Sequence, residues 1–262
     1  MLDDKLVKTI IAITHKAGDK IMEIYEKDFA IYEKSDESPL TEADLAAHNC
    51  IVDGLTSASD LPILSEESAN IAWEERKQWS SYWLVDPLDG TKEFIKKNGE
   101  FTVNIALIEN GVPIFGVVYA PVLEQTYVGV AGQGAYKITS GVQTAISPKV
   151  RENGETWKIV GSRSHQSPEI KALLDSLDGE TELVAMGSSL KLCLVAEGAA
   201  HLYPRLGPTS EWDTGAAQAV VEAAGGKVTI IEDSKDALKA NAAPLKYNQK
   251  DSVLNPYFLV SC

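Results

Sequence analysis

Residues 83–94 read Trp-Leu-Val-Asp-Pro-Leu-Asp-Gly-Thr-Lys-Glu-Phe, and this stretch decides how the rest of the chain is interpreted. The apolar run Trp83–Val85 is typical of a buried strand. Pro87 is expected to break that strand, because proline has no N–H to donate to a sheet. Asp86 and Asp89 flank the break. The pattern therefore predicts a rigid strand end that holds two carboxylates on one side.

The next two residues, Gly90 and Thr91, come where a helix is expected to begin. Backbone N–H groups at such a position bind anions, and phosphate oxygens suit them well. Carboxylates, in turn, are the ligands that hard cations prefer. The stretch is therefore interpreted as a metal-assisted phosphate site. The alternative is an acidic turn that only caps a helix.

Composition limits the classes of protein that the chain can belong to. Its 262 residues, 44% hydrophobic and 24% charged, are enough for one large domain or two closely packed subdomains. A net charge of −14 argues against binding a nucleic-acid polymer, which needs clustered Lys and Arg. Three scattered cysteines form no metal or disulfide pattern and favour a reducing cytoplasm. We expect no signal peptide and no transmembrane segment.

The first half of the chain is expected to mix helices with an antiparallel sheet. A helical apolar stripe covers about residues 3–25, and Thr41 is a candidate N-cap with Asp44 at the capping-box position. Leu61–Leu64 is a short strand that ends near Glu66. Further strands are predicted over residues 101–108, 112–119 and 125–130, with Asn110-Gly111 as a hairpin turn.

The second half alternates strands with helices and is therefore expected to be α/β. Ser188 and Ser189 are predicted to cap a helix that begins at Leu190, and Asp213 precedes a helix rich in small residues. Between the halves lies a polar, irregular segment. We expect an α+β subdomain over residues 1–145, which carries most of the metal ligands, and an α/β subdomain over residues 146–262.

Four carboxylates stand at the ends of predicted elements: Glu66, Asp86, Asp89 and Asp213. Each is weak evidence alone, because acids in loops are common. Together they provide the oxygen ligands that Mg²⁺ prefers, and two such ions can assist phosphoryl transfer. Asp213 also stands at a helix N-terminus, where the helix dipole attracts phosphate.

The combination of motifs resembles the inositol monophosphatase superfamily, the Mg²⁺-dependent, lithium-sensitive phosphatases. The resemblance rests on Asp86-Pro87-Leu88-Asp89-Gly90-Thr91, Glu66-Glu67, and Trp212-Asp213-Thr214-Gly215-Ala216 with Gly225-Gly226. The order and spacing of these motifs match across most of the chain. The fold that the resemblance implies is a layered αβαβα sandwich.

The resemblance also implies roles for individual residues. It gives Mg²⁺, as two or three ions, a set of ligands made of Glu66, Asp86, the Leu88 carbonyl, Asp89 and Asp213. Thr91 and Asp44 would together orient and deprotonate the attacking water. The N–H groups of Gly90 and Thr91 would hold the phosphate that is cleaved.

Within the superfamily the chain is most similar to the CysQ type, the 3′(2′),5′-bisphosphate nucleotidases. The similarity lies in Lys92-Glu93-Phe94, where inositol monophosphatases usually have Thr-Asn-Phe, and in residues 98–108, 162–165, 188–191 and 203–205. It implies hydrolysis of 3′-phosphoadenosine 5′-phosphate to AMP, as part of sulfur assimilation. Substrate contacts would come from Glu66, Leu88, Asp89, Gly90, Thr91, Asp213, His165, Ser188, Ser189, Lys191 and Arg205. Among the last five, Lys191 and Arg205 would hold the phosphate that is not cleaved.

Two other functions stay open at this point. The same chemistry could act on an inositol phosphate or a sugar bisphosphate, or the fold could bind a ligand without catalysis. The partner we expect is a small nucleotide in the cytoplasm. Some relatives associate peripherally with membranes. For this chain such an association would be with the cytoplasmic face of the inner membrane. Neither that association nor the oligomeric state follows from the sequence.

Overall fold

The fold is organised around strand β4 (Ser81–Asp89), which the computed structural model places in a seven-stranded sheet. The structure describes residues 2–27, 31–33, 39–161, 168–232 and 242–262. Side chains of β4 alternate between two hydrophobic cores. Tyr82 and Leu84 belong to the core on one face of the sheet, and Trp83 and Val85 belong to the core on the other face. The strand is therefore covered on both sides, as its apolar sequence predicts.

The seven strands lie in the order β3-β4-β5-β6-β7-β8-β9. Strand β3 pairs parallel to β4, and every other pair is antiparallel. The hairpin at Asn110-Gly111 is confirmed, because both residues have the positive φ that such a turn requires (50° and 78°). The remaining strands are β3 (Ile63–Ser65), β5 (Thr102–Glu109), β6 (Val112–Ala120), β7 (Gln125–Val130), β8 (Gly134–Thr139) and β9 (Val142–Ile146).

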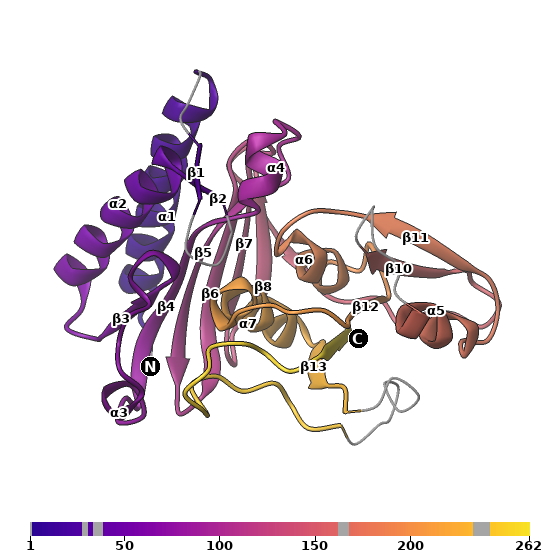
Figure 1. The fold of residues 1–262 in the computed structure, drawn as a ribbon. Helices are drawn as coiled ribbons and strands as arrows, with labels where there is room; N and C mark the ends of the chain where they lie inside the picture. The colour runs from indigo at the N-terminus through magenta and orange to yellow at the C-terminus, as the bar shows by residue number, and fades with distance from the viewer. Residues whose placement is uncertain (1, 28–30, 34–38, 162–167, 233–241) are drawn as a thin grey trace.

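Two helices cover one face of this sheet, α1 (Asp4–Tyr25) and α2 (Glu42–Ala58) (Figure 1). The apolar stripe of α1 is buried against the sheet, as the periodicity predicts. Helix α2 begins with the predicted capping box. The Thr41 side chain accepts the Ala43 N–H, and an Asp44 carboxylate oxygen accepts the Thr41 N–H at 2.7 Å. Asp44 is therefore fixed at the start of α2.

The opposite face is covered by α6 (Leu190–Ala196) and α7 (Gly215–Ala224), and a second sheet lies beyond them (Figure 1). Helix α5 (Pro168–Asp175) packs on the far side of that sheet through Leu173. The layers thus run helix, sheet, helix, sheet, helix, which confirms the predicted αβαβα sandwich. The second sheet has the order β11-β10-β12-β14-β13, with β10 (Trp157–Gly161), β11 (Thr181–Ala185), β12 (Leu202–Arg205), β13 (Lys227–Ile230) and β14 (Phe258–Ser261).

Helix α7 lies unusually close to the large sheet because two strand positions have no side chain. A Cβ atom on Gly116 would come within 2.1 Å of the Ala216 carbonyl oxygen, and one on Gly129 within 2.5 Å of the Ala219 carbonyl oxygen. Neither contact is sterically allowed, so both positions require glycine. The close approach brings the N-terminal end of α7, with Asp213 before it, toward the sheet that carries β4.

Two predictions about strands were wrong. Pro87 does not end its strand: β4 continues to Asp89, with a register shift against β5 between Asp86 and Asp89. Such a bulge accommodates a residue without an N–H. Strands β8 and β9 were not predicted, because β8 is only partly buried and β9 is largely exposed, so neither shows the apolar run of a buried strand. The boundary at residues 145 and 146 stays a prediction. The large sheet ends at Ile146, yet α7 from the second half packs on it.

Six short elements complete the chain, and three of them carry residues of the predicted site. The short helix η1 begins at Glu66, α4 begins at Thr91, and η2 ends at Asp213, while Asp44 lies in the first turn of α2. Their bounds are β1 (Ile31–Glu33), β2 (Pro39–Thr41), η1 (Glu66–Ser68), α3 (Trp73–Arg76), α4 (Thr91–Ile95) and η2 (Glu211–Asp213).

Candidate metal centre

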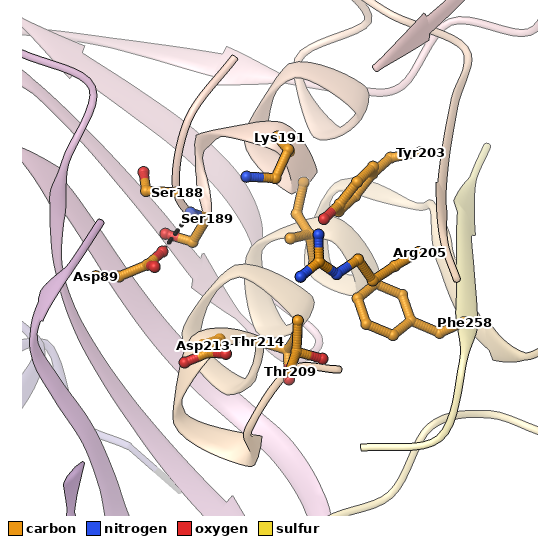
Figure 2. Close-up of a pocket in the computed structure, with 11 residues that line it drawn as sticks. Asp89, Ser188, Ser189, Lys191, Tyr203, Arg205, Thr209, Asp213, Thr214 and Phe258 are labelled. Atoms are coloured by element: carbon orange, nitrogen blue, oxygen red, sulfur yellow. Dashed lines mark hydrogen bonds between the residues drawn. The ribbon is translucent and has the colours of Figure 1, made fainter. Parts of the chain in front are cut away.

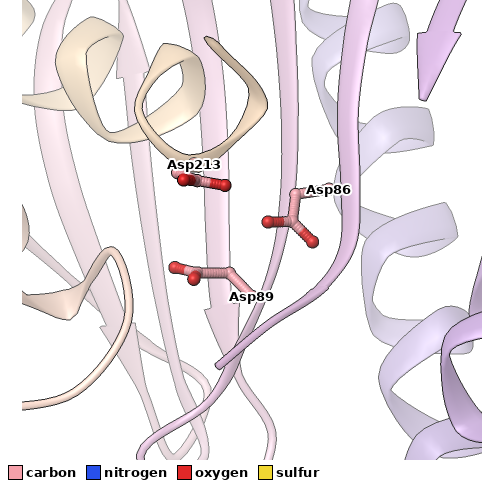
Figure 3. Close-up of side chains that lie close together, drawn as sticks. All are labelled: Asp86, Asp89 and Asp213. Carbon is pink, nitrogen blue, oxygen red and sulfur yellow. The ribbon is translucent and has the colours of Figure 1, made fainter. Parts of the chain in front are cut away.

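Three carboxylates converge at the end of β4. Each of Asp86, Asp89 and Asp213 places a carboxylate oxygen within 4.8 Å of the oxygens of the other two. Figure 3 shows Asp86 and Asp89 on the strand side and Asp213 facing them from the turn before α7. Residues more than 120 positions apart in the sequence thus meet at one point. The fold, and no local motif, creates this cluster.

Backbone and side-chain hydrogen bonds fix Asp213 in the cluster. One of its carboxylate oxygens accepts the Ser210 N–H at 2.8 Å, which leaves the other oxygen to face β4. The Asn255 side-chain amide donates to the Thr209 hydroxyl, the Ser210 carbonyl and the Thr214 hydroxyl, at 2.8 to 3.2 Å. Asn255 therefore holds both sides of the turn that carries Asp213.

A cleft of about 450 Å³ contains the cluster and the other predicted metal ligands. Glu66 reaches it because β3 runs parallel to β4, so the two strands end at the same edge of the sheet. The lining includes every predicted metal ligand and the start of α4: Glu66, Asp86, Leu88, Asp89, Gly90, Thr91 and Asp213. All these donors are oxygens, which fits a hard divalent cation such as Mg²⁺.

Burial and mutual repulsion make the negative charges of this cluster costly. Burial raises the pKa of Asp86 well above its usual 3.8, and Glu66 and Asp89 raise it further. The pKa of Asp213 rises to about 8, first through burial and then through Asp89. Burial also raises the pKa of Asp89, to about 6, although Lys191 and the Ser189 N–H oppose the shift. The site is therefore short of positive charge, which bound cations would supply.

These shifts predict how the stability of the metal-free protein depends on pH. The folded state binds protons more tightly than the unfolded chain between about pH 4 and pH 8, so stability falls as pH rises through that window. One pKa unit corresponds to about 1.4 kcal/mol, and the expected loss in Tm is about 5 °C or more. Adding Mg²⁺ should raise the Tm more at pH 8 than at pH 5, because the cation binds the ionised acids.

Thermal unfolding followed by circular dichroism, with chelator and then with Mg²⁺, measures both effects. The Asp86→Asn variant is the control, because it lacks the most buried acid and should lose much of the pH dependence without metal. A pH dependence that is identical in this variant would place its origin in the general surface charge of the protein.

Asp44 and Thr91 form the predicted pair beside the cluster. The Thr91 hydroxyl lies 3.2 Å from one Asp44 carboxylate oxygen and 3.4 Å from the Leu88 carbonyl oxygen. The other Asp44 oxygen accepts both the N–H and the hydroxyl of Thr41, at 2.7 and 2.6 Å. These two bonds hold the carboxylate in place. The pair can therefore accept a proton from a water in the cleft and pass it between fixed groups.

A second, smaller pocket of about 90 Å³ adjoins the cluster and is cationic. Figure 2 shows Lys191 and Arg205 pointing into the space opposite Asp89 and Asp213. Burial lowers the pKa of Lys191, Asp89 raises it, and Arg205 lowers it again. Arg205 donates to the Pro208 carbonyl at 2.8 Å, while its buried Nε has no hydrogen-bond partner among the described residues. The pocket thus offers charged donors to an anion.

The structure places the other predicted substrate-contact residues as follows. Ser188 lines the cationic pocket, with φ of 45°. His165 lies outside the described residues. Helix α6 begins at Leu190 with Ser189 at its N-cap, as predicted, but the Ser189 hydroxyl makes no capping bond; the Ser188 hydroxyl accepts the Leu190 N–H at 3.5 Å instead. Sequence reasoning missed Thr209, which lines both the cleft and the cationic pocket. Its nearness to Asp213 in the sequence was the available signal.

Comparisons with known proteins agree on one family. A model of the "Inositol monophosphatase family" matches residues 2–256. The 3′(2′),5′-bisphosphate nucleotidase CysQ of Escherichia coli strain K12 is 49% identical over 259 residues, which cover 98% of this chain and 99% of that protein. The CysQ nucleotidase of Haemophilus influenzae is 34% identical over 261 residues, which cover 99% and 93% of the two chains.

Solved structures give the same result. The crystal structure of CysQ from Bacteroides thetaiotaomicron, described as a bacterial member of the inositol monophosphatase family, superposes with a TM-score of 0.82 at 42% identity. The match covers 97% of this chain and 96% of that one. The suhB protein of Bartonella henselae, at 21% identity and a TM-score of 0.74 over 98% and 94% of the two chains, shares the fold.

Proposed function

The chain belongs to the inositol monophosphatase family, and from this membership we propose that it is a Mg²⁺-dependent 3′(2′),5′-bisphosphate nucleotidase. Its substrate would be 3′-phosphoadenosine 5′-phosphate, and its products AMP and phosphate. The observation that carries the proposal is the cationic pocket beside the acidic cluster, with Asp89 and Asp213 in the lining of both sites. A substrate with two phosphates needs an anion site next to the one where cleavage occurs.

The residues that would hold two or three Mg²⁺ ions are Glu66, Asp86, Asp89, Asp213 and the carbonyl of Leu88. When bound, Mg²⁺ supplies positive charge to the phosphate and makes a nearby water more acidic. The raised pKa values of Asp86, Asp89 and Asp213 fit this ligand set, since burial makes each carboxylate costly to ionise and a bound cation would offset that cost. Lithium sensitivity, which the resemblance implies, would arise at the same ligands.

Proton transfer is assigned to Thr91 and Asp44. The Thr91 hydroxyl donates to Asp44 and can accept from the attacking water on its second lone pair. One Asp44 oxygen is held by both Thr41 donors, so the other oxygen stays directed at Thr91. The N–H groups of Gly90 and Thr91 would hold the phosphate that is cleaved. The water, the hydroxyl and the phosphate then meet at the start of α4.

Substrate orientation is assigned to the second pocket. Lys191 and Arg205 would bind the phosphate that is kept, with the planar guanidinium of Arg205 suited to two hydrogen bonds. Ser188 lies at the edge of this pocket, where the ribose would enter, and His165 is proposed as a contact to the base or ribose. Such a nucleotidase would remove a by-product of sulfur assimilation in the cytoplasm.

Membrane association stays a separate proposal. Within the part of the chain that the structure describes, no helix has both the length and the apolar character needed to cross a bilayer. Peripheral attachment to the inner membrane, which some relatives show, would therefore need a surface contact.

Side-by-side turnover of three compounds tests the proposed function. We expect kcat/KM for 3′-phosphoadenosine 5′-phosphate to exceed that for inositol 1-phosphate by about 100-fold, because charged hydrogen bonds to the second phosphate contribute about 1.5–3 kcal/mol each. Fructose 1,6-bisphosphate, which has two phosphates but no base, should fall between them. Chelation of Mg²⁺ should stop release from all three. Preference for the inositol phosphate would reject the nucleotidase assignment.

A further inference from the structure

Strand β5 carries two polar side chains where its neighbours are apolar. Thr102 and Asn104 are 0% and 1% exposed, on a strand that is covered on both faces. Burying polar groups costs free energy unless they are hydrogen-bonded, so we expect these two side chains to have hydrogen-bond partners. Thr102 and Asn104 are two positions apart on the strand, and their side chains therefore point to the same face of the sheet.

The register of the sheet places this pair beside the metal ligands. In the antiparallel pairing of β4 with β5, Thr102 is the partner of Asp89, and Asn104 is the partner of Asp86. Directly opposed residues in an antiparallel pair project to the same face, with their Cβ atoms about 5 Å apart. The two polar residues of β5 thus form a row next to the two acids of β4.

The row is joined to the second half of the chain through Ser189. The Ser189 hydroxyl lies 2.8 Å from the Thr102 hydroxyl and donates to the Asn104 carbonyl oxygen at 2.9 Å. Because Ser189 has one hydroxyl proton, which Asn104 receives, Thr102 is the donor in the first bond. Ser189 is 2% exposed, so these contacts are largely shielded from bulk water, although Ser189 also lines the cationic pocket. A directed chain of bonds therefore runs from β5 into the start of α6.

The backbone of the same serine holds a metal ligand. The Ser189 N–H donates to a carboxylate oxygen of Asp89 (Figure 2), at 2.5 Å. The position of this N–H depends on where the Ser189 side chain is anchored. In addition, Asn104 is paired with Asp86 across the two strands, and its buried side-chain amide nitrogen has no hydrogen-bond partner among the described residues. Each acid of β4 therefore has a polar neighbour from this group.

We propose that Thr102, Asn104 and Ser189 are positioning residues that orient Asp89 for metal binding. The Thr102 hydroxyl fixes the Ser189 side chain, the Ser189 N–H then fixes one oxygen of Asp89, and the other oxygen is directed at the cation. This role replaces a direct contact of the Ser189 hydroxyl with substrate. It rests on the proposed metal site and adds residues to it that act through Asp89 and not as metal ligands themselves.

A purely structural role is the rival explanation, because the same bonds also tie β5 to α6. The two explanations differ in one measurable way. Loss of a structural bond lowers stability wherever it occurs in the sheet. Loss of a positioning bond also weakens metal binding, and removal of hydrogen bonds to metal ligands typically costs about 10- to 100-fold in metal affinity.

The test is Mn²⁺ binding to the purified protein, with electron paramagnetic resonance or calorimetry reporting the Kd without any turnover. Mn²⁺ takes the place of Mg²⁺ because both prefer oxygen ligands and Mn²⁺ is paramagnetic. We expect Thr102→Val, which keeps the shape of the side chain, to raise the Kd about 10-fold. Thr102→Ser should restore binding. Ser189→Ala should weaken binding to a similar extent without altering β5, and the double variant should show no further loss.

The matched control is Thr126→Val. Thr126 is equally buried on β7 of the same sheet, and its hydroxyl bonds to His15 at 2.8 Å, far from the cleft. It should lose stability like Thr102→Val and keep the Kd of the unaltered protein. Equal Kd values in Thr102→Val, Ser189→Ala and Thr126→Val would overturn the positioning role. Failure of the unaltered protein to bind Mn²⁺ would instead reject the metal site, and with it the proposed function.

Discussion

Asp89→Asn should lower kcat/KM for the bisphosphate by about 1000-fold or more and leave the metal-free protein as stable as before. Asp89 places a carboxylate oxygen within 4.8 Å of Asp86 and Asp213, and its Oδ2 accepts the Ser189 N–H. Asparagine keeps an oxygen for that N–H but removes one negative charge from the ligand set. Metal ions stabilise a phosphoryl transition state by several kcal/mol, and each 1.4 kcal/mol corresponds to tenfold in rate.

The expected stability of the Asp89→Asn variant follows from the repulsion among the three carboxylates. Asp89 raises the pKa of both Asp86 and Asp213, which means that its charge repels theirs. Neutralising Asp89 removes that repulsion, so the Tm of the metal-free protein at pH 8 should stay equal or rise. Asp53→Asn, at an exposed position of α2, is the control for loss of a carboxylate and should retain full activity. If the Asp89→Asn variant kept more than about a tenth of the kcat/KM of the unaltered protein, a metal-ligand role for Asp89 would be contradicted.

The second large effect is expected at Lys191. The Lys191 amine lies over the Tyr203 ring, with Nζ 5.9 Å from the ring centroid. Lys191→Met removes the charge and keeps an unbranched apolar side chain that can pack on the same ring. We expect kcat/KM for 3′-phosphoadenosine 5′-phosphate to fall about 100-fold, since losing one partner of a buried charge pair costs about 2–5 kcal/mol. A nucleoside monophosphate, which has no second phosphate for the pocket, should change less than about threefold.

Steady-state kinetics on both substrates make this comparison. Lys137→Met is the matched control: Lys137 forms an ion pair with Glu197 at 2.8 Å and lines neither the cleft nor the cationic pocket. It should leave both substrates unaffected. An equal loss of kcat/KM on the bisphosphate and the monophosphate would contradict a role of Lys191 in the second phosphate site. It would indicate that Lys191 acts through its electrostatic interaction with Asp89.

Local features of the sequence predicted what local physics determines. The buried strand at Trp83–Val85, the capping box of Thr41 with Asp44, and the hairpin at Asn110-Gly111 all depend on residues within a few positions of each other. The layered fold was implied by the resemblance to the inositol monophosphatase superfamily, which rests on the order and spacing of several motifs. Pro87 was misjudged because a strand can absorb a missing N–H in a bulge when the neighbouring strand, here β5, pairs with it on both sides of the bulge.

Features that depend on contacts between distant segments could not be derived from local patterns, and it was the resemblance that assigned Asp213 and Asp86 to one ligand set. The meeting of Asp213 with Asp86 depends on how closely α7 approaches the sheet, which Gly116 and Gly129 allow. Ser189 matched a helix cap in the sequence, yet its hydroxyl bonds to Thr102 and Asn104, more than 80 residues away. Strand β8 is partly buried and β9 is largely exposed, and neither sequence shows a pattern that separates a strand from a loop.

Identification of the product formed from 3′-phosphoadenosine 5′-phosphate tests the central claim most directly. With Mg²⁺ present, phosphorus NMR of the reaction should show loss of the 3′-phosphate alone, with AMP and one inorganic phosphate as products, at a kcat/KM above that for inositol 1-phosphate. This result follows if the acidic cleft cleaves one phosphate while Lys191 and Arg205 hold the other. Release of the 5′-phosphate, or faster turnover of inositol 1-phosphate, would contradict the account.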